Sequence, residues 1–215
     1  MTTSFRHWWR LGADCPTPWW VLIPRPPLAH PPRCLSLTLR ALLARQGFDI
    51  EIKLATPDDM AVTPPSEVER MVDNILGAVE VAEARDEGQG KRKRPLLFSS
   101  FDPDVCDRVK RRRPFDCVMF LSTGGTSYHA DWRRMSIDAA IEVAVLCGLQ
   151  GVILDSGALW RDQGAVARAK AKGMAVMTYG QENDDVAWVE GQRRLGVHGV
   201  IVDDVEKMRA AFLGG

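Results

Sequence analysis

The sequence has little of what disulfide-rich proteins and zinc sites need. It contains five cysteines and four histidines, and no two cysteines form a Cys-x-x-Cys pair or lie at metal-ligand spacing from a histidine. Five is also an odd number, which argues against a closed disulfide framework. We therefore predict reduced and mostly buried thiols at the scattered positions Cys15, Cys34, Cys106, Cys117 and Cys147.

The chain also lacks an excess of charge and a long apolar run. Lys plus Arg and Asp plus Glu both number 28, so the formal net charge is zero and no positive field is available to attract nucleic acid or an anionic membrane surface. No run approaches the roughly 18 apolar residues that a membrane span requires. We expect a soluble cytoplasmic protein with no nucleic-acid partner and no transmembrane segment, although an organelle-targeting role of the first residues stays open.

Residues 1–34 differ in composition from the rest of the chain. They hold four of the seven tryptophans and seven of the thirteen prolines, with Asp14 as their single acidic residue. We interpret residues 1–34 as a Pro/Trp-rich leader of no assigned fold and residues 35–215 as the folded domain. A mispredicted exon or a truncated start is the favoured explanation for this leader.

Six short apolar segments alternate with helical stretches from Phe48 onward. The segments are continuous, rich in Val, Ile, Leu and Phe, and bounded by Gly or Pro, which is typical of parallel strands that are covered on both faces. They are FDIEIKL (48–54), PLLFSSFD (95–102), CVMFLSTGG (117–125), GVILDSG (151–157), MAVMTYG (174–180) and GVIVDD (199–204). The helices are expected at about 66–84, 103–112, 136–147, 163–172, 184–195 and 205–212.

This alternation predicts an α/β fold of the TIM-barrel type. A complete barrel has eight strands and takes about 250 residues, with about 200 as a minimum. Because only six strands are predicted, the barrel is expected to be incomplete and to lack its first strands. A doubly wound parallel sheet with Asp155 and Asp203 as strand-end carboxylates is the alternative, although the segment STGGTS (122–127) lacks the lysine of a phosphate-binding loop.

Every predicted strand ends in side chains that can hydrogen-bond or ionise. The carboxyl ends of parallel strands line the ligand cleft in barrels and in open sheets, so one shared site explains all of them. These strand-end residues are Glu51 with Lys53, Ser99 with Ser100, Ser122 with Thr123, Asp155, Thr178 with Tyr179, and Asp203.

The first strand, FDIEIKL, alternates charged and apolar residues. The outer face of a barrel is covered by helices and must be apolar, which assigns Ile50, Ile52 and Leu54 outward and Asp49, Glu51 and Lys53 inward. The alternative is an edge strand that exposes its charged face to water. An interior Glu beside an interior Lys is costly unless a ligand neutralises them. Glu51 therefore predicts a divalent cation and Lys53 an anionic oxygen such as that of a phosphate.

Four segments together resemble the glycerophosphodiester phosphodiesterase family, in particular its eukaryotic members that also carry an SPX domain. The segments are FDIEIK, PLLFSSFDPDVC, MTYGQEN and LGVHGVIVDDV, and the likeness runs from about Leu35 to Val205. The resemblance implies a TIM barrel and an enzyme of lipid metabolism. With Mg²⁺ or Ca²⁺ as cofactor, such an enzyme hydrolyses a small-molecule glycerophosphodiester to glycerol 3-phosphate and an alcohol.

The same resemblance implies roles for five residues. Glu51 corresponds to the metal-binding glutamate of the family and Lys53 to the lysine beside the phosphate. Ser100 and Phe101 correspond to the end of the next strand, and Tyr179 stands where an aromatic ring packs on the glycerol moiety. These four non-metal positions are the predicted substrate-binding residues.

The family segments that carry the catalytic histidines have no counterpart in this sequence. His7 and His30 lie in unrelated sequence, and His129 and His198 are predicted to be structural or exposed. No catalytic residue is therefore identified, and the chain is expected to be a fragment without turnover of its own. The alternative function is a non-catalytic barrel remnant that binds an anionic ligand or a protein, with homo-oligomers formed through the open barrel edges.

Overall fold

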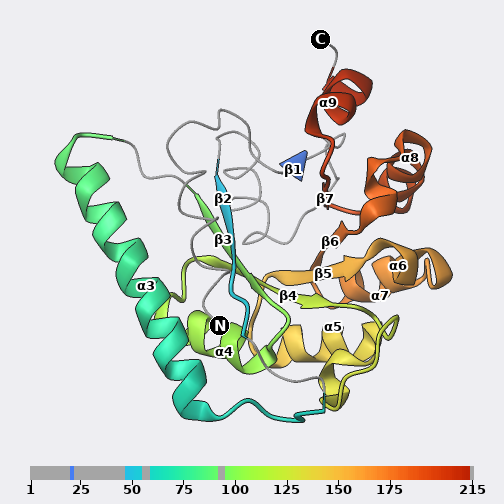
Figure 1. Cartoon of the computed structure of the whole chain (residues 1–215). Helices are drawn as coiled ribbons and strands as arrows, with labels where there is room; N and C mark the ends of the chain where they lie inside the picture. Colours follow the sequence, from blue (N-terminus) through green and yellow to red (C-terminus); the bar gives the residue numbers. More distant parts are fainter. Residues whose placement is uncertain (1–19, 22–46, 55–58, 92–94, 214–215) are drawn as a thin grey trace.

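The computed structural model describes residues 20–21, 47–54, 59–91 and 95–213 (Figure 1). They form one curled sheet with the strand order β1-β7-β6-β5-β4-β3-β2. The six strands from β2 to β7 pair in parallel with their neighbours, which confirms the predicted α/β fold and its incomplete TIM barrel. These strands are β2 (Phe48–Glu51), β3 (Leu96–Ser100), β4 (Cys117–Ser122), β5 (Gly151–Asp155), β6 (Ala175–Tyr179) and β7 (Gly199–Ile201).

A further short strand comes from the leader. Strand β1 (Trp20–Val21) pairs antiparallel with β7, with Trp20 opposite Ile201. The sequence offered no sign of this strand, because two residues are too few to show a period. The proposed boundary between leader and domain at residues 34 and 35 lies outside the described residues.

Helices cover the outer face of the sheet (Figure 1). They are α3 (Pro65–Gly88), α4 (Pro103–Arg112), α5 (Ile137–Leu146), α6 (Ser156–Arg161), α7 (Ala165–Ala171), α8 (Val186–Leu195) and α9 (Val205–Leu213), with the 3₁₀ turns η1 (Trp132–Arg134) and η2 (Gln181–Asp184). All six predicted helices are present. Helix α6 was not predicted, because the Asp-Ser-Gly that opens it has the composition of a turn.

The ends of these helices follow from local chemistry. Ser136 precedes α5, and its Oγ caps the helix by accepting the amide N–H of Ala139 at 3.1 Å. Asp155 caps α6 in the same way, with Oδ1 accepting the amide N–H of Ala158 at 2.8 Å. Gly196 ends α8 with φ at 92°, a left-handed conformation that glycine adopts without the steric cost of a Cβ.

The two faces of the sheet bury two different apolar clusters. Ile52, Phe98 and Phe120 point outward and pack against the helices in the larger core. Alternate residues point inward and form a smaller cluster, which consists of Leu97, Cys117, Met119, Leu121, Ile153, Ala175 and Met177. The strands therefore read as continuous apolar runs because both of their faces are buried.

The described cysteines are free thiols, and the described helices are too short or too polar to cross a membrane. Cys106 and Cys117 are buried, Cys147 is partly buried, and all three are free thiols. Burial raises the pKa of the Cys117 thiol to about 12, so this thiol stays protonated at neutral pH. Among the described residues, no helix combines the length and the apolar character needed to cross a bilayer.

Candidate functional site

Strand β2 places its carboxylates on the inner face of the sheet. It pairs in parallel with β3, so that Glu51 lies opposite Ser99. Ser99 Oγ donates a hydrogen bond of 2.8 Å to Asp49 Oδ1, while Ile52 is 1% exposed in the helix-side core. The inward assignment of Asp49 and Glu51 is therefore correct, and β2 is also the last strand of the described sheet, as the alternative expected of an edge strand.

Glu51 and Lys53 form an ion pair at the carboxyl end of β2. Lys53 Nζ lies 3.3 Å from Glu51 Oε2, and the side chains are 65% and 24% exposed, respectively. We expected both in the interior, but Lys53 is mostly exposed because it lies two residues beyond the last residue of the strand. Glu51 Oε1 is buried and accepts no hydrogen bond in the described part of the chain. A buried carboxylate oxygen without a donor is costly unless a cation reaches it.

An aromatic pair lies at the same end of the sheet. The rings of Phe101, which follows β3, and Tyr179, the last residue of β6, meet edge to face with centroids 5.7 Å apart. Burial raises the pKa of Tyr179, the negative charges of Asp155 and Glu51 raise it further, and the positive charge of Arg134 lowers it. These charges act on one phenol, so Glu51 lies near Tyr179 at the carboxyl end of the sheet. This end, with Glu51, Lys53, Phe101 and Tyr179, is called the mouth below.

Ser100 lies on the opposite face of the sheet from Glu51 and Tyr179. Its Oγ donates a 2.7 Å hydrogen bond to the carbonyl of Ile52 and accepts the amide N–H of Asp102 at 3.1 Å. The side chain is fully buried and joins the end of β2 to the start of α4. The structure therefore places Ser99, and not Ser100, on the inner face. A contact between the Ser100 hydroxyl and a ligand stays a prediction from the resemblance alone.

Arg134 is a residue of the mouth that the sequence did not reveal. It ends η1 in the loop that follows β4, and its guanidinium carbon lies 5.9 Å from the centroid of the Phe101 ring. The signal that could have identified Arg134 is its place in a loop after the carboxyl end of a strand.

The two described histidines make hydrogen bonds to the backbone. His198 Nδ1 accepts the amide N–H of Val176 at 3.1 Å, at the amino ends of the strands and therefore away from the mouth. His129 Nδ1 accepts the amide N–H of Asp131 at 2.9 Å. Both contacts agree with the predicted structural roles. His7 and His30 lie outside the described residues.

The residues of the mouth fit a divalent cation at one position. Within the described ranges, no group of three or more His, Cys, Asp or Glu side chains is arranged to hold a metal ion. Glu51 nevertheless offers a buried carboxylate oxygen that accepts no hydrogen bond in this part of the chain, and carboxylate oxygen is the ligand type that Mg²⁺ and Ca²⁺ prefer. Glu51 can therefore supply one ligand, and water or substrate oxygens would have to supply others.

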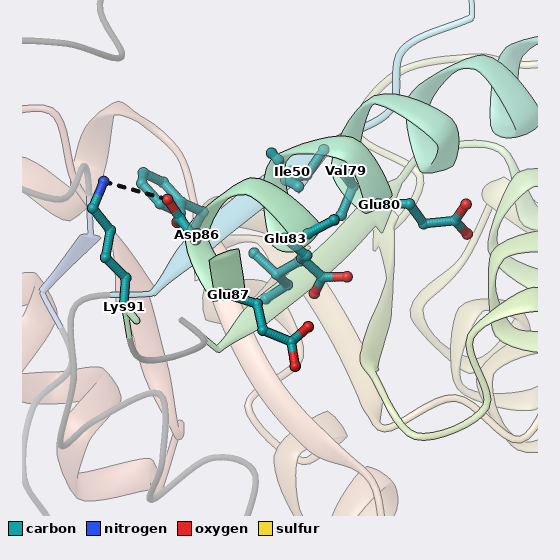
Figure 2. Close-up of a pocket in the computed structure, with 11 residues that line it drawn as sticks. Ile50, Val79, Glu80, Glu83, Asp86, Glu87 and Lys91 are labelled. Atoms are coloured by element: carbon teal, nitrogen blue, oxygen red, sulfur yellow. Dashed lines mark hydrogen bonds and ion pairs between the residues drawn. The ribbon is translucent and has the colours of Figure 1, made fainter. Parts of the chain in front are cut away.

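A separate groove of about 700 Å³ lies between α3 and the edge of β2 (Figure 2). Its apolar wall includes Phe48 and Leu96, which lie at the amino ends of β2 and β3 and so at the far end of the strands from Glu51. The rim along α3 is acidic, with Glu80, Glu83, Asp86 and Glu87. Because these carboxylates repel an anion, the groove is not the place for a phosphodiester.

The phenol of Tyr179 offers a direct test of how the mouth is arranged. Tyr179 and Tyr128 are the only tyrosines of the chain, so Tyr128→Phe leaves one phenol to titrate by ultraviolet absorbance. The pKa of Tyr179 is expected above its usual value of 10, lower when Glu51→Gln or Asp155→Asn is added, and higher when Arg134→Gln is added. Glu142→Gln, on the exposed side of α5, serves as the control and is expected to leave the pKa unchanged. Equal pKa values in all variants would contradict the shared mouth.

Comparison with known proteins adds independent evidence. The model of the glycerophosphoryl diester phosphodiesterase family matches residues 29–207. A glycerophosphodiester phosphodiesterase of Arabidopsis thaliana is 35% identical over 166 residues, which cover 77% of this chain and 42% of the relative. A glycerophosphocholine phosphodiesterase of Candida albicans is 30% identical over 181 residues, covering 80% of this chain and 15% of the relative. The chain thus spans less than half the length of these curated relatives.

Solved structures share the fold. A putative glycerophosphoryl diester phosphodiesterase of Silicibacter pomeroyi superimposes with a TM-score of 0.56 at 18% identity, covering 83% of this chain and 55% of that one. A phosphodiesterase of Oleispira antarctica, in complex with the product sn-glycerol-3-phosphate, gives a TM-score of 0.54 at 20% identity, covering 77% and 54%. At these identities the likeness concerns the fold.

Proposed function

Since this chain belongs to the glycerophosphoryl diester phosphodiesterase family, we propose that its strand-end mouth takes part in the metal-dependent hydrolysis of a glycerophosphodiester to glycerol 3-phosphate and an alcohol. The observation that carries the proposal is the buried Oε1 of Glu51, which lacks a hydrogen-bond donor in the described part of the chain. An acidic ligand, a lysine and two aromatic rings at one end of a parallel sheet suit a phosphate linked to glycerol.

Each residue of the mouth has a role in this proposal. Glu51 would hold the divalent cation, Mg²⁺ or Ca²⁺, which when bound would supply Lewis-acid polarisation of the phosphate. The ammonium of Lys53 attracts the phosphate, and its exposure lets it turn from Glu51 toward a ligand. Phe101 and Tyr179 present apolar ring surface to the glycerol carbons, while the Tyr179 hydroxyl stays protonated and can donate a hydrogen bond.

The edge of the sheet is also the proposed route to oligomers. Within the described residues, β2 is the last strand of the sheet order and pairs only with β3. An edge strand of this kind exposes backbone N–H and C=O groups that a second strand can pair with. We propose that a second copy, or another segment of a longer chain, covers this edge.

Binding of glycerol 3-phosphate tests the role of Glu51. With Mg²⁺ or Ca²⁺ present, Glu51→Gln is expected to weaken binding at least about tenfold, because a charge-assisted contact is worth about 1.5–3 kcal/mol. Calorimetry measures the dissociation constant. The control, Glu142→Gln, removes an equally charged carboxylate that is exposed on α5 and is expected to bind as the wild type does.

Two results would decide against parts of this proposal. Binding that is equally tight in Glu51→Gln, or that does not respond to EDTA, would remove Glu51 as the metal ligand. Release of glycerol 3-phosphate from glycerophosphocholine is measured in the same samples, and none is expected from this chain alone, because the catalytic histidine segments have no counterpart in its sequence. Metal-dependent release that Glu51→Gln abolishes would show instead that the chain contains a complete acid–base pair.

A further inference from the structure

The loop after β4 fixes the backbone of Arg134 at the mouth. Asp131 caps η1, with Oδ1 accepting the amide N–H of Arg133 at 3.0 Å, and the amide N–H of Arg134 donates to the carbonyl of Asp131 at 3.0 Å. Ser122, the last residue of β4, donates from Oγ to the carbonyl of Arg134 at 3.4 Å. The backbone of Arg134 is thus anchored directly to the end of a central strand.

The two consecutive arginines of this loop have different environments. The Arg133 guanidinium donates to both carboxylate oxygens of Asp104 at 2.8 Å and to Asp131 at 2.8–3.1 Å. This double pairing joins the loop to α4 and is structural. The Arg134 guanidinium lies over the Phe101 ring, where its charge also acts on Tyr179. Arg134 is therefore the arginine of this pair that is directed to the mouth.

A buried histidine lies beside the Arg134 guanidinium. His129 is 7% exposed, and its Nδ1 accepts the amide N–H of Asp131 at 2.9 Å, which fixes the imidazole against the loop. Its Nε2 lies 2.6 Å from Arg134 Nη1, so the ring limits the positions that the guanidinium can take. A guanidinium has five N–H donors and can therefore also bind an anionic oxygen.

We propose that Arg134 binds an anionic oxygen of the substrate, namely of its phosphate, and that His129 positions the Arg134 guanidinium. This inference rests on the proposed function for the identity of the anion. It adds a cation from the loop between β4 and α5 to Lys53, which follows β2, so the phosphate would lie between the two, beside the aromatic pair. In this arrangement the metal would bind at Glu51 and the anion at Arg134, with Tyr179 near both.

Binding of inorganic phosphate and of glycerol 3-phosphate in EDTA isolates Arg134 from the metal. Arg134→Gln is expected to weaken both at least about tenfold, and Arg134→Lys by less, because lysine keeps the charge but loses the two-pronged geometry. His129→Gln is expected to weaken them in part. NMR titration measures the dissociation constants, and the ¹⁵N shift of the Arg134 side chain is expected to move as the anion binds, which a purely structural arginine would not show.

Arg194→Gln is the matched control, because Arg194 is exposed on α8 and pairs only with Glu190 among the described residues. Equal affinity of Arg134→Gln and the wild type, with Glu51→Gln still impaired in metal, would overturn this inference and leave the proposed function intact. If binding depends on Arg134 but metal has no effect on it, the further inference stands and the metal-dependent function is contradicted. Absence of any anion binding by the wild type, or failure of Arg134→Lys to bind better than Arg134→Gln, would also contradict the assignment.

Discussion

Asp49→Asn is expected to raise the free energy of unfolding by about 4 kcal/mol at pH 8 and by almost nothing at pH 4. Burial raises the pKa of Asp49 from 3.8 to about 7, the hydrogen bond from Ser99 opposes this, and the charge of Glu51 adds to it. A shift of about three units corresponds to about 4 kcal/mol. Asparagine has no charge to bury, and its amide oxygen can accept the same hydrogen bond from Ser99.

The sign of this effect follows from the direction of the shift. The pKa of Asp49 is higher in the folded protein than in the unfolded chain, so the protonated carboxyl favours folding below pH 4. That contribution is lost as the pH rises from about 4 to about 7, where folding must hold an ionised carboxylate in a buried place. Asp49→Asn removes this dependence.

Urea unfolding of wild type and variant across pH 4 to 8 measures the difference directly, and taking the difference cancels the titration of all other groups. Asp138→Asn is the control, since this carboxylate is exposed at the first turn of α5 and its removal is expected to matter little at any pH. If Asp49→Asn changes the free energy of unfolding equally at pH 4 and pH 8, the pKa of Asp49 is not raised by burial.

Gln192→Ala is expected to lower the free energy of unfolding by about 3 kcal/mol. Gln192 is 1% exposed on α8 and accepts a 2.5 Å hydrogen bond from Thr178, while its Nε2 donates to Asn183 Oδ1 at 2.7 Å. Asn183 in turn donates to the carbonyl of Ile201. Truncation removes the acceptor of the Thr178 hydroxyl and the donor to Asn183 Oδ1, at about 1–3 kcal/mol for each unsatisfied buried group, in addition to a cavity.

This buried network also supports the mouth. Thr178 directly precedes Tyr179, and Asn183 lies in η2, so the network joins the end of β6 to α8 and β7. Gln192→Ala is therefore expected to weaken binding of glycerol 3-phosphate as well. Gln181→Ala, at an exposed position of η2, is the control for stability. A loss below about 0.5 kcal/mol in Gln192→Ala, the size typical of surface changes, would show that the network contributes little.

The strands and the facing of β2 could be predicted from the sequence, because both depend on which residues are apolar. Ile52 had to face the helices, and that placed Glu51 inside. The choice between Ser99 and Ser100 could not be made in this way. It depends on the register of β3 against β2, and two adjacent serines give no sign of which one faces Glu51.

Arg134 and α6 were missed for a related reason. Arg133 and Arg134 are identical in type, and their contacts with the described residues differ: Arg133 pairs with two carboxylates, whereas Arg134 contacts an imidazole and lies over an aromatic ring. Two of these contacts, with Asp104 and Phe101, involve residues from an earlier part of the chain. Helix α6 depends on Asp155 acting as a cap, whereas the sequence suggested Asp155 only as a strand-end carboxylate.

Strand β2 carries Glu51 and, among the described strands, pairs on one side only. A strand that pairs on one side only separates more readily than one that pairs on both sides, so the position of Glu51 depends on the pairing of β2 with β3. A ligand that binds Glu51 only when β2 is paired with β3 stabilises that pairing. Measured ligand affinity and the local stability of this edge strand are therefore thermodynamically linked.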